Sequence, residues 1–149
     1  RRALPHFKGE PFFTYNSDSI WLESFGSNLV RMAQRWDDAE MDCLMLMAAT
    51  FSSIGYDGPG DFSMDAVGHL TRRQPQRVTP FGWPGVQIMH PRLVEKGPDG
   101  VFSTNRLWDI ALEHGRLFGL RLDGKWMHIG TPEAKAEADR YLSERHKVP

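Results

Sequence analysis

The run MDCLMLMAAT, residues 41–50, constrains the fold of this chain more than any other segment. It is apolar almost throughout and has the length of one strand, which is typical of a strand buried on both faces, although periodicity alone does not exclude a buried helix. The preceding segment places Leu29, Met32 and Trp36 at helical spacing, and Ser27 before them is a favourable N-cap. A helix followed by a buried strand indicates an α/β fold.

A second strand is expected at PFFTY, residues 11–15. Its aromatic and β-branched residues suit a pleated surface that is buried on both sides. We therefore expect a parallel strand that runs through the middle of the sheet.

The remaining segments alternate between turn signals and short apolar stretches, without internal repeats, and we expect a single domain over residues 1–149. The expected elements are a hairpin that turns at Asp65–Gly68, a strand over 78–88 interrupted by prolines and glycines, a helix over 103–115 capped by Ser103, two short strands forming a hairpin about Asp123–Gly124, and a helix that begins at Thr131.

Composition limits the possible partners. The formal charge of −1 provides no global field for nucleic acid or an anionic membrane, so we expect neither as a partner. No run approaches the roughly 18 apolar residues that a membrane-spanning helix requires. The single cysteine, Cys43, lies in the apolar run; it favours a reducing, cytoplasmic setting and is expected to be a small buried hydrophobe.

The triplet Asn16–Ser17–Asp18 follows the PFFTY strand directly. In an open α/β sheet, ligands collect beyond the carboxyl ends of the strands, and Mg²⁺ asks the protein for only one or two carboxylates. Asp18 is therefore a candidate metal ligand. The alternative is that Asp18 caps the following turn through its side chain, which Asn, Ser and Asp commonly do.

A second candidate is the stretch WMHIGTPEA, residues 126–134, where His128 ends a strand and Thr131 opens a helix. The N–H groups and the Thr131 hydroxyl at a helix N-terminus can bind an anion. Thr131 followed by Pro132 is equally what any stable helix start uses, and a lone His near an apolar strand is more often structural than a ligand.

Four segments, taken together and in order, resemble bacterial sugar-1-phosphate nucleotidyltransferases, specifically the C-terminal part of the small type that acts on N-acetylmuramate 1-phosphate or mannose 1-phosphate. These segments are PFFTYNSDSIW, GYDGPGDFSMDAVGHLTRR, GVQIMHPRL and FSTNRLWDIALEHGRLFGLRLDGKWMHIGTPEA. The resemblance implies a Rossmann-like three-layer α/β/α fold with a mixed sheet. It also implies Mg²⁺-dependent transfer of a nucleotide from UTP or GTP to a sugar 1-phosphate.

The resemblance assigns roles to individual residues. Asp18 matches the metal-binding and catalytic aspartate, with Asn16 beside it on the same turn. His128 stands where many relatives carry a second metal-binding aspartate, and imidazole is a poorer ligand for Mg²⁺ than carboxylate, which makes a water-mediated role conceivable. The positions that match the sugar side of the cleft are Gly60, Asp61, Gly85 and Asn105; Trp108 falls in the same segment but also fits the core face of its helix.

The family's glycine-rich basic loop and the first strands of its sheet are not found in the 149 residues. This absence predicts that the chain is a fragment, or that a second copy covers an exposed apolar edge of the PFFTY strand in an exchanged dimer. Besides the enzyme, two other functions remain open: a non-catalytic fragment that keeps affinity for sugar phosphates, and a hydrolase that uses the Asp and His as a pair.

Overall fold

The computed structural model describes residues 2–145. Its elements are η1 (Leu4–Phe7), β1 (Phe12–Tyr15), β2 (Ser19–Glu23), α1 (Asn28–Arg35), β3 (Cys43–Ala49), η2 (Thr50–Ser52), β4 (Phe62–Met64), β5 (Leu70–Arg72), β6 (Phe81–Gly82), β7 (Val86–Met89), α2 (Pro91–Glu95), α3 (Asn105–Glu113), β8 (Leu117–Arg121), β9 (Gly124–His128) and α4 (Pro132–Arg145).

The strand β3 lies at the centre of a mixed sheet. The strand order is β1-β7-β3-β6-β4-β5, and β8 joins the sheet by pairing with β3. The pairing of β3 is parallel to β8 and antiparallel to β7 and β6. All residues of β3 from Cys43 to Met47 are fully buried, which confirms the prediction made from the apolar run.

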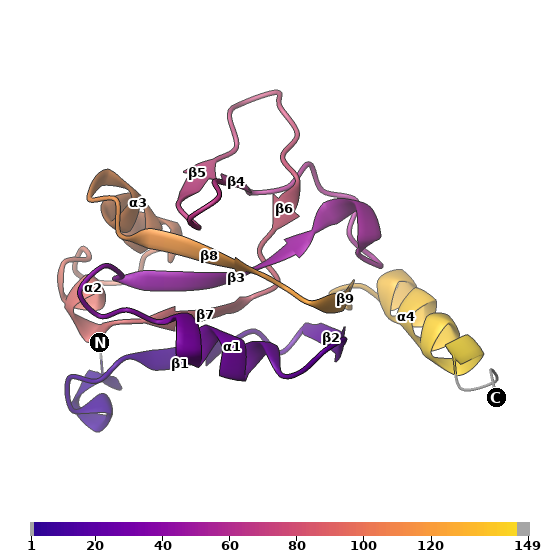
Figure 1. The fold of residues 1–149 in the computed structure, drawn as a ribbon, viewed down its shortest axis with the longest axis horizontal. Helices are drawn as coiled ribbons and strands as arrows, with labels where there is room; N and C mark the ends of the chain where they lie inside the picture. Colours follow the sequence, from indigo (N-terminus) through magenta and orange to yellow (C-terminus); the bar gives the residue numbers. More distant parts are fainter. Residues whose placement is uncertain (1, 146–149) are drawn as a thin grey trace.

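Alternate residues of β3 face two separate cores, because successive side chains of a strand point to opposite faces. Cys43, Met45 and Met47 pack against residues of α2 and α3. Leu44 and Leu46 pack on the other face, where α1 contributes Met32. The helices thus cover both faces of the sheet; in Figure 1, α1 is seen below β3, near β1 and β7. This arrangement is the three-layer architecture that the sequence predicts.

The strand β1 differs from the prediction. It pairs antiparallel with β7, as Phe12 opposite Met89 illustrates, and it lies at the end of the strand order rather than in the middle. Phe13 and Tyr15 are 44% and 50% exposed. The sequence analysis treated the aromatic residues of β1 as buried on both sides, whereas only the face with Phe12 packs on a core. The expected apolar edge is confirmed for the part of the chain that the structure describes.

The hairpin expected about Asp123–Gly124 is also wrong. The strand β8 pairs in parallel with β3, whereas β9 pairs antiparallel with β2 in a separate two-stranded sheet. The strand β2 was not predicted. The Asp–Gly dipeptide therefore marks a change of sheet, and pairing with distant strands overrides the local turn preference.

The helices α1, α3 and α4 and the first hairpin agree with the sequence, whereas α2 was not predicted and the N-cap of α3 is Thr104 rather than Ser103. The strands β4 and β5 pair about the turn at Asp65–Gly68, and the Ser27 hydroxyl caps α1 by accepting a hydrogen bond from the Val30 N–H. The helix α4 packs on β9, and Figure 1 shows it extending away from the body of the molecule. Among residues 2–145, no helix has the length and apolar character needed to cross a membrane.

Candidate functional site

Asp18 lies on the turn that follows the carboxyl end of β1, with an exposed side chain. The strand β2 begins at the next residue and sets Ser19 opposite His128 in the antiparallel pair with β9. The Ile129 N–H also donates a hydrogen bond of 3.0 Å to the Asp18 carbonyl oxygen. The two predicted metal ligands therefore occupy neighbouring positions on two paired strands.

Their side chains border the same small space beside the main chain of Gly130. A Cβ atom at Gly130 would lie 2.8 Å from the His128 Nε2 atom and 3.6 Å from the Asp18 Oδ2 atom. Within residues 2–145, no three His, Cys, Asp or Glu side chains are grouped to hold a metal ion. The pair suits an ion such as Mg²⁺ that takes most of its ligands from water and phosphate, with Asp18 as the direct protein ligand.

Thr131 lies next to this pair and opens α4. Its hydroxyl oxygen accepts a hydrogen bond of 3.2 Å from the Ala134 N–H, so the predicted helix start at Thr131 is confirmed. The side chain of Thr131 is exposed, and the N-terminus of α4 lies directly after the segment that carries His128. A phosphate contact at Thr131 stays a prediction.

Asn16 and Gly85 approach each other closely at the junction of β1 and β7. The Asn16 N–H donates a hydrogen bond of 3.0 Å to the Gly85 carbonyl oxygen. A Cβ atom at Gly85 would lie 2.6 Å from the Asn16 Cβ atom, and the φ angle of Gly85 is +84°. Only glycine combines this angle with so close an approach. Two of the predicted sugar-side residues thus lie in contact, two positions from Asp18.

Gly60 has a structural role in its turn, besides the sugar-side position that the resemblance assigns to it. Its φ angle is +80°, and a Cβ atom there would lie 2.3 Å from the Thr79 carbonyl oxygen. A side chain at this position would clash with the main chain of Thr79, so the position requires glycine. Asp61 follows it, and its Oδ2 atom accepts a hydrogen bond of 2.8 Å from the Trp83 N–H.

Asp61 and Asn105 line one cavity of about 340 Å³ between the β4–β5 hairpin and α3; the other lining residues are Phe62, Arg72, Arg73, Trp83 and Trp108. A second cavity of about 320 Å³ contains Asn16 and also has Trp83 in its wall. Trp83 therefore stands between the Asn16–Gly85 contact and the cavity that holds the other predicted sugar-side residues. Asn16, Asp61 and Asn105, from segments far apart in the sequence, thus line two cavities that share a wall. Gly85 is not in the lining of either cavity but lies against Asn16.

Trp108 belongs both to the core and to this cavity. It is 6% exposed, and its indole N–H donates a hydrogen bond of 2.8 Å to the buried Gln87 side chain. The core interpretation of Trp108 is confirmed, and one surface of its ring system also lines the cavity.

The sequence analysis missed the side chains that shape this cavity most. Arg72 and Arg73 end the motif HLTRR, for which only a hairpin was predicted, and Trp83 lies in the segment FGWPGVQ, where only Gly85 was predicted as a site residue. Two adjacent arginines at the end of a short strand, close to a Gly-Asp pair, were a signal for a charged cavity.

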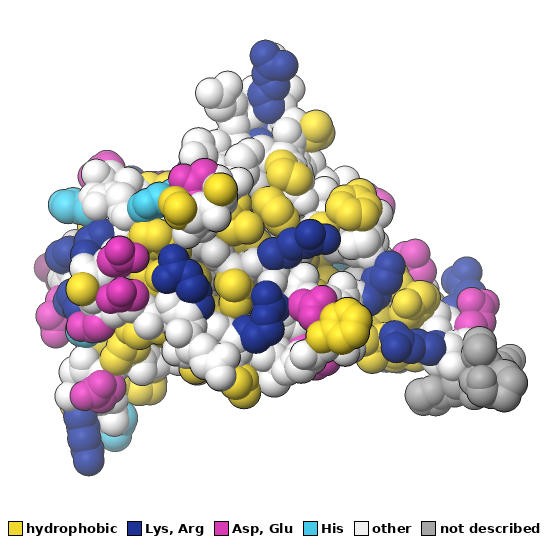
Figure 2. All heavy atoms as spheres, in the orientation of Figure 1, with side chains coloured by type: hydrophobic (Ala, Val, Ile, Leu, Met, Phe, Trp, Pro, Cys, Tyr) yellow, Lys and Arg dark blue, Asp and Glu magenta, His cyan; other side chains and the backbone are white. Residues whose placement is uncertain are grey.

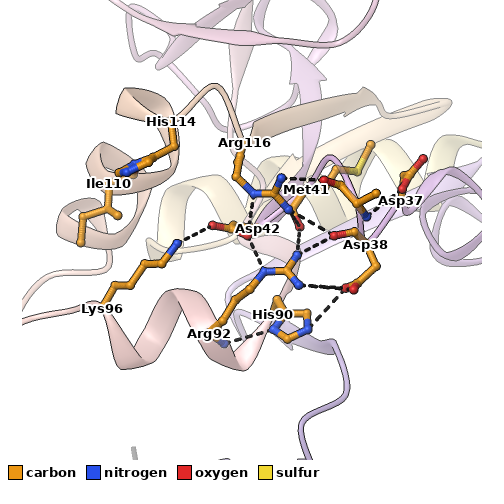
Figure 3. A network of polar contacts seen from close by, with 11 residues as sticks. Asp37, Asp38, Met41, Asp42, His90, Arg92, Lys96, Ile110, His114 and Arg116 are labelled. Carbon is orange, nitrogen blue, oxygen red and sulfur yellow. Dashed lines mark hydrogen bonds and ion pairs between the residues drawn. The ribbon is translucent and has the colours of Figure 1, made fainter.

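A second polar cluster lies at the other end of the parallel strands. Figure 3 shows Arg92 and Arg116 directed at Asp42, a fully buried carboxylate just before β3. The N–O distances are 2.6 Å and 2.8 Å, and Lys96 approaches at 3.3 Å. Ligands of α/β sheets bind beyond the carboxyl ends of the strands, whereas this cluster lies at the amino ends of β3 and β8. We therefore infer that the cluster around Asp42 stabilises the fold and is not part of the ligand site.

These cations also explain the titration of Asp42. Burial alone would raise its pKa, but hydrogen bonds from Arg92 and Arg116, followed by the charge of Arg116 and a hydrogen bond from Lys96, outweigh that effect and lower the pKa to about 2. The carboxylate therefore stays ionised inside the protein.

Comparison with known proteins places this geometry in context. No family model matches the chain. The chain is 37% identical, over 144 residues, to the N-acetylmuramate alpha-1-phosphate uridylyltransferase of Caulobacter vibrioides, and the alignment covers 97% of this chain and 60% of that protein. The resemblance inferred from the sequence motifs is confirmed, and the chain spans less than two thirds of the length of this relative.

Two solved structures share the fold. HddC from Yersinia pseudotuberculosis superposes with a TM-score of 0.68 at 16% identity, over 95% of this chain and 59% of that one. A putative glucose-1-phosphate thymidylyltransferase from Bacillus anthracis gives 0.65 at 11% identity, over 99% of this chain and 59% of that one. The chain thus has the mixed α/β fold of part of these proteins, as the sequence predicts.

Proposed function

We propose that this chain carries the metal and sugar-phosphate side of a nucleotidyltransferase that acts on a sugar 1-phosphate. A phosphate oxygen of the sugar 1-phosphate would attack the α-phosphorus of a nucleoside triphosphate, the bond from that phosphorus to the bridging oxygen would break, and pyrophosphate would leave. Such a reaction needs positioning and neutralisation of charge rather than a protein nucleophile. The observation that carries the proposal is the placement of Asp18 beside His128, next to Thr131 and Asn16.

Each residue has a distinct part in this proposal. Asp18 would hold Mg²⁺ directly and His128 through water, and the ion would neutralise phosphate charge when bound. The hydroxyl and N–H groups at the start of α4, beginning with Thr131, would orient a phosphate. Asn16 and Asp61 would bind the sugar, since amide and carboxylate oxygens accept hydrogen bonds from its hydroxyl groups.

The 37% identical relative, the N-acetylmuramate alpha-1-phosphate uridylyltransferase, supports a choice of substrates. We therefore propose UTP and an N-acetylmuramate-like sugar 1-phosphate as first choices, with GTP as the alternative nucleotide. We also propose that the protein works in the cytoplasm, because its single cysteine, Cys43, is unpaired.

A second candidate is a fragment that binds sugar phosphate without turnover. It is favoured by one observation: the imidazole of His128, a poorer ligand for Mg²⁺ than a carboxylate, lies near Asp18.

Release of pyrophosphate from UTP and N-acetylmuramate 1-phosphate in the presence of Mg²⁺ would test the enzyme directly, with Asp18→Asn as the inactive control. If neither protein releases pyrophosphate, binding of the sugar 1-phosphate by calorimetry decides between the two candidates. Binding without turnover supports the non-catalytic fragment, whereas absence of both overturns the proposed function. Phosphate release without sugar would instead support the hydrolase.

A further inference from the structure

Arg73 carries a positive charge that no carboxylate neutralises within residues 2–145. Its Nε atom donates a hydrogen bond of 3.0 Å to the Gly60 carbonyl oxygen, and its Nη1 atom donates one of 3.1 Å to the Arg77 carbonyl oxygen. Its main-chain N–H donates to the Asp61 carbonyl oxygen at 2.9 Å. The Nη1 atom also lies 3.4 Å from the Gln74 carbonyl oxygen. The carbonyl groups of Gly60, Gln74 and Arg77 hold the side chain in place but leave its charge unpaired, and no hydrogen bond of its Nη2 atom is seen in the described part of the chain.

The neighbouring Arg72 is different, because its charge is already compensated. Its Nε atom forms an ion pair of 2.8 Å with Asp109, and its two terminal nitrogens donate hydrogen bonds to Asn105. Its guanidinium also lies over the rings of Phe62 and Trp108, with centroid distances of 5.3 Å and 5.8 Å. Arg72 therefore builds the wall of the cavity, and Arg73 supplies its free positive charge.

The rest of the cavity suits a single sugar ring. Its volume of about 340 Å³ falls in the range of small-molecule sites. The aromatic side chains of Trp83 and Trp108 offer apolar surface to the C–H face of a ring. The Asp61 carboxylate has acceptor capacity beyond its hydrogen bond from the Trp83 N–H, and sugar hydroxyl groups can use it.

A neutral sugar has no group that pairs with Arg73. A guanidinium that is held by carbonyl groups through Nε and Nη1 and is open at Nη2 can donate a charge-assisted hydrogen bond to a carboxylate. From this geometry we infer that Arg73 makes the cavity selective for a sugar 1-phosphate that carries a carboxylate. This inference rests on the proposed function and adds the residue that determines specificity.

The test compares two sugar 1-phosphates that differ in one acidic substituent. N-acetylmuramate 1-phosphate and N-acetylglucosamine 1-phosphate share the ring, the acetamido group and the phosphate, but only the first carries a lactyl carboxylate. Calorimetric titration of this chain with each gives a ratio of dissociation constants. We expect the acidic sugar to bind more tightly by about 10-fold or more, as expected for a hydrogen-bonded charge pair.

Three variants assign that ratio to Arg73. Arg73→Gln should weaken binding of the acidic sugar by about 10-fold to 100-fold and leave the neutral sugar within about 2-fold. Arg73→Lys should keep part of the preference, because the charge remains. Arg77→Gln is the matched control: its side chain is exposed, it does not line the cavity, and the ratio should stay unchanged.

The possible results separate the inference from the proposed function. Equal binding of both sugars to the wild type overturns the inference while the proposed function stands. Equal weakening of both sugars by Arg73→Gln does the same, because it means that Arg73 only holds the loop in place. If the wild type binds neither sugar, the proposed function and the inference fail together.

Discussion

Asp18 and His128 both border Gly130, where a Cβ atom would lie 2.8 Å from the His128 Nε2 atom and 3.6 Å from the Asp18 Oδ2 atom. The pairing of β2 with β9 brings the two residues to this position. Because the two side chains share the space beside Gly130, a single methyl group can test whether they act together.

Gly130→Ala should therefore disturb the proposed metal site more than the fold. The added methyl displaces the end of the His128 side chain, and Gly130 is exposed, so we expect a melting temperature close to that of the wild type. The affinity for Mn²⁺ in the presence of UTP, measured by electron paramagnetic resonance, should fall by about 10-fold, as expected when one ligand is misplaced. Ala136→Ser, at an exposed position of α4, is the control. An unchanged Mn²⁺ affinity would contradict joint binding by the two side chains.

Gly85 allows a second test, directed at the contact with Asn16. Gly85→Ala should cost about 2–4 kcal/mol, since it adds strain at φ +84° to a clash with the Asn16 side chain 2.6 Å away. Gly115→Ala is matched to it, because its φ angle is +65° but no atom lies within 4 Å, and it should cost only about 1 kcal/mol. Urea unfolding of both variants measures the difference. Equal costs would mean that the Asn16 contact relaxes freely.

Asp42 should give the protein a marked sensitivity to acid. Its folded-state pKa of about 2 lies below the ordinary value of 3.8, so its contribution to stability is complete above the ordinary value and is lost as the pH falls toward 2. The shift corresponds to about 2 kcal/mol.

Unfolding by urea between pH 6 and pH 2 measures this contribution. Asp42→Asn should cost about 3 kcal/mol at pH 6, because the partly exposed cations around this buried side chain lose their counter-charge, and it should flatten the acid dependence. Asp139→Asn removes an exposed pair with Lys135 and should change stability by less than about 1 kcal/mol. If Asp42→Asn keeps the full acid dependence of the wild type, other carboxylates cause it.

Cys43 should be inert to thiol reagents in the folded protein. Burial, with a smaller contribution from the Asp42 charge, raises the pKa of its thiol far above the ordinary value, and the side chain is fully buried. Its thiol donates to the Gln87 side chain at 3.3 Å. Reaction with Ellman's reagent should be negligible under native conditions and complete in concentrated guanidinium chloride. Rapid reaction of the native protein would show that β3 opens readily.

The sequence predicted the elements whose signals are local. The apolar run of β3 and the Ser27 cap of α1 depend on residues within one segment, and both were predicted correctly. The edge position of β1 and the separation of β8 from β9 depend on pairing with distant strands, which no local pattern encodes.

The candidate site shows the same division. The motif around Asp18 and the motif around His128 could each be identified in the sequence. The two residues lie near each other because β2, a strand that was not predicted, pairs with β9. The unpaired charge of Arg73 emerges only in the fold, since the sequence does not reveal that Asp109 pairs with Arg72 rather than with Arg73.

The exposed side of β1 leads to a prediction about association. No strand pairs with the outer edge of β1 within residues 2–145, and Phe13 is 44% exposed on the face that carries α1. Figure 2 shows that face, where hydrophobic side chains lie between those of Lys and Arg. An open strand edge beside apolar side chains is a template for pairing with another chain.

We therefore expect the average mass in light scattering to rise with protein concentration. Phe13→Lys should shift the onset of association to a concentration at least about 10-fold higher, because a charge beside an open edge opposes pairing. Val101→Lys adds the same charge at a fully exposed position on the α2–α3 connection, away from β1, and should leave the onset unchanged. A wild-type chain that stays monomeric at every concentration would rule out both pairing through β1 and the exchanged dimer.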